Sequence, residues 1–89
     1  MRTSVNNITD EHVGATGVHF AGDVLYMELN DGREIRVPMG RVSWMRWLVE
    51  ATPEQREKWN VEPGGFAIYW EDLDDGIEIG RLLAMQPLK

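Results

Sequence analysis

The chain of 89 residues contains no cysteine, which excludes disulfide bonds and thiolate metal sites. It also lacks any run that approaches the roughly 20 apolar residues needed to span a bilayer. Its first residues, Met-Arg-Thr-Ser-Val-Asn-Asn, lack the apolar stretch of a secretory signal peptide. We therefore expect a cytoplasmic protein that does not contact a membrane.

Basic residues are scarce. Nine Lys and Arg stand against fifteen Asp and Glu, which gives a formal net charge of −6. The arginines in the middle of the chain are interleaved with acids, so we expect no direct nucleic acid binding, which depends on Lys and Arg. An acidic domain suits a basic protein partner, although such a charge also keeps a small protein soluble.

Recognisable catalytic and metal-binding patterns are missing as well. His12 and His19 are the only histidines, and they lie seven residues apart, which fits a two-histidine metal site neither on a helix nor on a strand. No serine or threonine stands in a nucleophile elbow. The pair Gly64-Gly65 is not followed by the Lys-Ser or Lys-Thr of a phosphate loop. We therefore predict no catalytic residue, no cofactor and no metal ion.

The hydrophobic content of 43% suffices for one modest core. We assign residues 1–12, which are polar and without periodicity, to a flexible N-terminal segment, and residues 13–89 to a single domain. A domain of this size buries only about 60% of the surface that its unfolded chain exposes. A homodimer or a bound partner would therefore be a source of additional stability.

A β-hairpin is the clearest local element. Residues 24–29 alternate in the manner of a strand, with leucines and methionine on one face. The pair Asp31-Gly32 follows and is a strong turn signal, because glycine accepts a positive φ without a Cβ clash. Residues 33–37 form the returning strand, which Pro38 ends because proline cannot donate to the ladder.

A bent helical unit is expected after the hairpin. Ser43 suits a helix N-cap, and Trp44, Trp47 and Leu48 follow on one helical stripe. The sequence Thr-Pro-Glu-Gln then starts a second short helix over residues 53–59. Its threonine and glutamine form a capping box, and its proline suits the first helical position.

The remaining segments complete an α+β domain. A strand is expected at residues 66–70, an acidic turn at 71–76, a short strand at 77–79 and a closing helix or turn at 80–85. With a first strand at residues 15–20, the pattern predicts one small, mostly antiparallel sheet with two short helices packed on one face.

The tryptophans and the acidic turn supply the candidate binding residues. Tryptophan fills small cores, as we expect for Trp70, and also anchors interfaces, where neighbouring methionines provide an adaptable surface. The acidic run does not match an EF-hand loop. It is either a solvated turn or a partner-binding edge. The candidate partner-binding residues are Trp44, Met45, Trp47, Asp72, Asp74 and Asp75.

Two motifs in this region carry a family resemblance. Residues 51–56 read Ala-Thr-Pro-Glu-Gln-Arg, and residues 70–77 match the pattern Trp-x-x-Leu-Asp-x-x-Ile. Together with the Trp-bearing helix, they resemble a small bacterial family of domains of unknown function, DUF2442. The resemblance implies the α+β fold from about Val18 to Leu83. Relatives often place a histidine directly before the strand tryptophan, where this chain has Tyr69.

The resemblance also suggests a role. Similar proteins are often encoded beside a second small gene, an arrangement like a toxin–antitoxin pair, and some carry a helix-turn-helix domain. We therefore expect a non-catalytic protein-binding module that acts by contact with a partner protein. Two alternatives remain: an acidic phage-type inhibitor that mimics nucleic acid to block a host defence nuclease, and a small enzyme. The enzyme hypothesis lacks a convergent set of polar residues.

Overall fold

A computed structural model describes residues 13–85 and contains two three-stranded antiparallel sheets. The sheet orders are β2-β3-β4 and β5-β6-β7. The strands are β2 (Ala15–Ala21), β3 (Val24–Leu29), β4 (Glu34–Pro38), β5 (Trp59–Val61), β6 (Ala67–Trp70) and β7 (Asp75–Glu78). The α+β class is confirmed, with the strands divided between two sheets instead of gathered in one.

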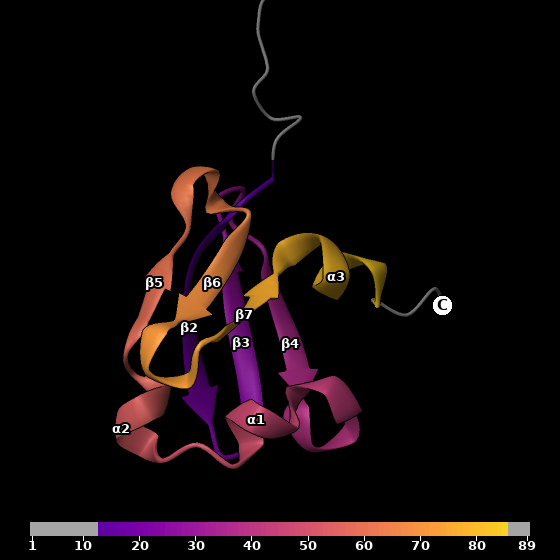
Figure 1. The fold of residues 1–89 in the computed structure, drawn as a ribbon. Helices are drawn as coiled ribbons and strands as arrows, with labels where there is room; N and C mark the ends of the chain where they lie inside the picture. Colours follow the sequence, from indigo (N-terminus) through magenta and orange to yellow (C-terminus); the bar gives the residue numbers. More distant parts are fainter. Residues whose placement is uncertain (1–12, 86–89) are drawn as a thin grey trace, which may run out of the picture.

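The helical elements are short and lie around the sheets (Figure 1). The α-helices are α1 (Arg46–Val49), α2 (Pro53–Arg56) and α3 (Ile79–Ala84). Single 3-10 turns are η1 (Met39–Arg41), η2 (Ser43–Met45), η3 (Pro63–Gly65) and η4 (Glu71–Leu73). Within residues 13–85, no helix combines the length and the apolar character needed to cross a membrane.

The predicted hairpin is confirmed, and so is the first strand. β2, β3 and β4 form a meander in which β3 is central. At the β3–β4 turn, the Gly32 amide donates to the Leu29 carbonyl at 3.1 Å, and Gly32 has a φ of 91°. The Asp31 carboxylate accepts hydrogen bonds from the backbone N–H and the Nε of Arg33. These hydrogen bonds and the positive φ of Gly32 define the turn, and the turn sets the pairing register of β3 with β4.

One hydrophobic core lies between the two sheets. Leu25 and Met27 of β3 and Ile68, Trp70 and Ile77 of the second sheet are all fully buried in it. Figure 1 shows the orange strands of the second sheet crossing in front of the indigo and magenta strands of the first. The prediction that Trp70 belongs to the core is confirmed. Its indole N–H is also satisfied, because it donates to the Arg56 carbonyl at 3.0 Å.

Of the two predicted helix N-caps, Thr52 is present and Ser43 is not. The capping box is confirmed: the Gln55 amide donates to the Thr52 hydroxyl at 3.1 Å, and the Thr52 amide donates to the Gln55 side chain at 2.9 Å. The predicted Ser43 cap is wrong, because this residue lies inside the η2 turn and makes no capping hydrogen bond there. The second helix is also shorter than predicted. It ends at Arg56, and Trp59 begins β5.

Arg56 joins three segments at the base of the sheets. Its guanidinium donates to the carbonyls of Leu48, Val49 and Gly22 at 2.9–3.1 Å and to the Asp23 carboxylate at 2.9 Å. Its side chain is only 13% exposed. These bonds connect α2 with α1 and with the β2–β3 turn, so Arg56 organises the helical end of the domain.

The predicted flexible segment, residues 1–12, lies outside the described residues. The expected single domain is described over residues 13–85 as two sheets around one core.

Candidate functional site

Trp44 and Trp47 are half-buried and pack against the core. The Arg81 guanidinium lies 3.8 Å from the Trp44 ring centroid, so it covers one face of this indole. Trp47 packs edge-to-face on Trp70, with 5.6 Å between the ring centroids. Both indoles therefore already have partners within the chain. Their proposed contact with another protein stays a prediction for the part of each ring that faces solvent.

Met45 cannot contact a partner in this structure, because its side chain is fully buried. Its position between Trp44 and Trp47 and the flexibility of methionine had predicted an adaptable apolar surface. The chain instead forms the 3-10 turn η2 before α1 begins at Arg46. The tighter turn directs Met45 into the core with Leu48. Met39, in η1, is buried in the same way.

The acidic turn is exposed, but two of its three candidate aspartates stabilise the turn itself. Asp74 adopts the left-handed conformation, with a φ of 52°, and accepts a 2.6 Å hydrogen bond from the Tyr69 hydroxyl. This bond raises the pKa of Tyr69. Asp75 accepts from the Gly76 amide at 2.8 Å. Asp72 pairs with the exposed Lys58 at 3.6 Å, a separation at which solvent weakens the attraction.

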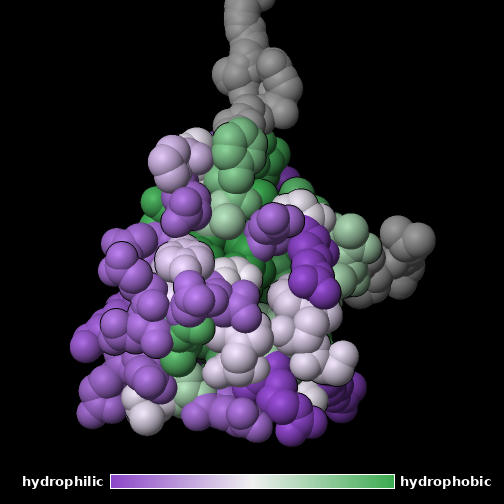
Figure 2. Space-filling view, viewed as in Figure 1, coloured by the Kyte–Doolittle hydropathy of each residue, from purple (hydrophilic) through white to green (hydrophobic). Residues whose placement is uncertain are grey.

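An apolar groove opens at the other end of β6. Its volume is about 740 Å³, and its apolar lining comes from Val13 ahead of β2, from the η3 turn and the start of β6, and from α3. Figure 2 shows apolar surface gathered between the β5–β6 turn and α3. The apolar side chains that line the groove are Val13, Pro63, Phe66, Ala67, Ile79 and Leu83. Sequence reasoning missed this groove because its walls are distant in the chain.

Phe66 is the most exposed large apolar side chain that lines the groove, at 58%. Its carbonyl accepts from the Ile79 amide at 2.9 Å, which ties its backbone to the start of α3. Gly64 has a φ of 80°, and a Cβ atom there would lie 2.7 Å from Cε2 of Phe66. The positive φ favours glycine at this position, and a side chain here would contact the Phe66 ring.

Two glutamates border the groove in a defined arrangement. The Glu62 amide donates to the Ala67 carbonyl at 2.9 Å, and Ala67 pairs with Glu78 across the β6–β7 ladder. Glu62 and Glu78 thus flank Ala67 from the segments on either side of β6, and both are exposed. Since adjacent strands lie about 4.8 Å apart, the backbones of the two acids are separated by about 10 Å. Negative charge therefore lies directly beside the apolar groove.

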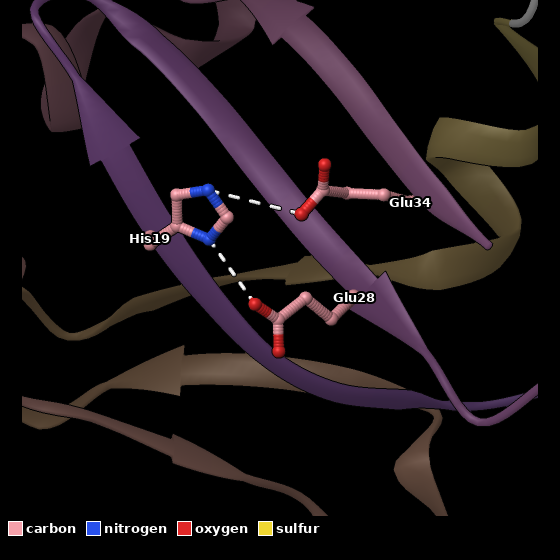
Figure 3. A group of neighbouring side chains, drawn as sticks. All are labelled: His19, Glu28 and Glu34. Carbon is pink, nitrogen blue, oxygen red and sulfur yellow. Dashed lines mark hydrogen bonds and ion pairs between the residues drawn. The ribbon is translucent and has the colours of Figure 1, made fainter. Parts of the chain in front are cut away.

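A cluster of one histidine and two glutamates lies on the outer face of the first sheet (Figure 3). His19 Nδ1 is 3.1 Å from a Glu28 carboxylate oxygen, and Nε2 is 3.7 Å from a Glu34 oxygen. The imidazole stacks on the Tyr26 ring at 4.8 Å with an interplanar angle of 9°. The spacing of the two histidines along the chain does not reveal this cluster. Strand register was the missing signal, because it aligns Glu28 with Glu34 beside His19.

Comparison with known proteins places this fold among uncharacterised relatives. No curated protein matches the chain. A solution NMR structure of an uncharacterised protein from Chromobacterium violaceum has a TM-score of 0.68 at 23% identity, covering 84% of this chain and 68% of that one. A crystal structure of a protein of unknown function from Rhodospirillum rubrum has a TM-score of 0.66 at 19% identity, covering 81% and 86%.

These two similarities show a shared fold. The family model described as "Protein of unknown function (DUF2442)" matches residues 15–86, which span both sheets and all three α-helices. The chain therefore belongs to the DUF2442 family.

Proposed function

We propose that this domain is a non-catalytic protein-binding module whose groove beside Phe66 receives a basic, partly apolar segment of a partner protein. The observation that carries the proposal is the adjacency of an exposed aromatic ring and two exposed glutamates. Aromatic anchors supply much of the binding energy at interfaces. Complementary charges around them select the partner and accelerate encounter.

The apolar part of the groove provides the attraction. Burying a phenylalanine side chain fully contributes about 1.5–3 kcal/mol, so covering the exposed part of Phe66 would contribute about 1–2 kcal/mol. Ile79 and Leu83 add apolar wall that a partner side chain would cover. An aliphatic or aromatic side chain of the partner fits this environment, since a charged one would lose its hydration there.

The acidic border defines the chemistry of the partner. Glu62 and Glu78 stand on either side of Ala67, so a Lys or Arg next to the apolar anchor would lie within reach of both carboxylates. The net charge of −6 attracts the same kind of segment over longer distances. A neutral or acidic segment would leave the two glutamates desolvated without a counter-charge.

The genomic arrangement implied by the family resemblance suggests where such a partner is encoded. A small protein from the neighbouring gene is the first candidate, in an arrangement similar to a toxin–antitoxin pair. In this proposal, the domain acts by contact alone.

The test compares two variants, each of which reverses two acidic charges, at different places on the surface. One carries Glu62→Lys and Glu78→Lys at the groove, and the other carries Asp72→Lys and Asp75→Lys at the acidic turn. Each tagged protein is used to recover partners from host lysate, and the partner is then purified and titrated by calorimetry. We expect the groove variant to bind at least about tenfold more weakly and the turn variant to bind like the unmodified domain.

The opposite result would assign binding to the acidic turn and reject the groove. Light scattering provides a further control. If the unmodified domain forms a dimer and the groove variant is a monomer, the groove is a contact between copies of this chain and not a partner site.

A further inference from the structure

We propose that His19, Glu28 and Glu34 bind a divalent transition-metal ion of the Zn²⁺ type on the outer face of the first sheet. One candidate ligand atom from each residue lies within 4.8 Å of the others. In Figure 3 the three side chains come from three different strands or strand ends and converge above the same face. This site is separate from the groove and does not depend on the proposed function.

The backbone holds the three residues close together. β3 pairs Glu28 directly with Glu34 of β4, and on its other side it pairs with β2, which carries His19. Two carboxylates that face each other across a ladder repel. A bound dication between the two carboxylates would remove this repulsion. The local charge therefore favours a cation at this position.

The donor types select the metal. An imidazole nitrogen with two carboxylate oxygens suits Zn²⁺ and related ions, whereas Mg²⁺ and Ca²⁺ prefer all-oxygen ligands. Ligand atoms around a tetrahedral Zn²⁺ are about 3.4 Å apart, and only one imidazole nitrogen can bind the ion. The carboxylate that faces the other nitrogen must therefore turn toward the bound one and move inward by about 1 Å. The side chains of His19, Glu28 and Glu34 are 51%, 51% and 45% exposed, which leaves them room to do so.

Two neighbouring features support the site. The stacked Tyr26 ring restricts rotation of the imidazole and keeps its nitrogens above the sheet. A shallow hollow, bordered by Thr16, Glu28 and Glu34, opens beside the carboxylates. Three protein ligands would leave a coordination position open, and water could reach it through this hollow.

Calorimetry with ZnCl₂ at neutral pH, combined with ¹H–¹³C NMR of the histidine rings, tests the proposal. We expect saturable binding of one ion, with shifts at the His19 ring. The variant Glu28→Gln with Glu34→Gln should lose roughly tenfold or more in affinity. MgCl₂ should not shift the same ring.

Two controls match these variants. Glu54→Gln with Glu57→Gln removes the same charge from exposed positions near α2, and it should bind Zn²⁺ like the unmodified chain. His12→Ala removes the only other histidine and should also preserve binding. Thermal melting confirms that each variant is folded. The proposal is overturned if Zn²⁺ binding does not saturate, or if it persists unchanged in His19→Ala.

Discussion

Arg56 is predicted to be the single polar residue whose loss most weakens the helical end of the domain. Its nearly buried guanidinium donates to the carbonyls of Leu48, Val49 and Gly22, and it pairs with Asp23. A hydrogen bond from a charged donor contributes about 1.5–3 kcal/mol, and such contributions are not additive. Because the Asp23 side chain is 61% exposed, we give that pair little weight.

On this basis, Arg56→Ala should reduce the free energy of unfolding by about 2–5 kcal/mol. Arg56→Lys keeps the charge but loses the planar fork, so it should recover only a minor part of the loss. Urea denaturation followed by circular dichroism measures both values.

The matched control is Arg46→Ala. The side chain of Arg46 is 77% exposed and meets Glu50 at 3.7 Å, so its removal should change the stability by less than about 0.5 kcal/mol. If Arg56→Ala costs less than about 1 kcal/mol, or if Arg56→Lys is as stable as the unmodified protein, the reasoning from these contacts is refuted.

Three further predictions concern the two turns. Gly32→Val forces a β-branched residue to a φ of 91° and should cost about 1–3 kcal/mol, seen as a lower melting temperature; unchanged melting would contradict the turn geometry. The Arg33 backbone N–H lowers the pKa of Asp31, so this carboxylate stabilises the fold above its unfolded pKa of about 3.9 and the effect disappears as the pH falls through the lower folded pKa. Asp31→Asn should flatten that part of the acid denaturation profile, and an identical profile would exclude the effect. The hydrogen bond to Asp74 raises the pKa of Tyr69, so its stabilising effect is complete below about pH 10 and decreases above it. Ultraviolet titration of Tyr69 should give a midpoint above 10 that moves down in Asp74→Asn.

Local signals in the sequence predicted several elements correctly. The alternation of residues 24–29, the Asp31-Gly32 turn and the Thr52 capping box each depend on neighbours within a few residues, and all three are present. The buried state of Trp70 was also predicted, because a large aromatic side chain on a strand of a small domain belongs in the core.

The errors arose where distant segments determine local structure. Trp59 continues a helical pattern in the sequence, but in the fold it pairs with Trp70 across the β5–β6 ladder. Met45 lies between two tryptophans that were predicted to contact a partner, but the 3-10 turn directs it inward. The groove at Phe66 and the cluster at His19 depend on strand register, which spacing along the chain does not reveal.

The central claim is that the groove binds a basic, partly apolar segment, and selection from a random peptide library on the immobilised domain tests it most directly. Peptides recovered on the unmodified domain should place Lys or Arg beside an aliphatic or aromatic anchor. They should bind the variant Glu62→Lys with Glu78→Lys at least about tenfold more weakly. Recovery of acidic peptides, or equal binding to both proteins, would contradict the account.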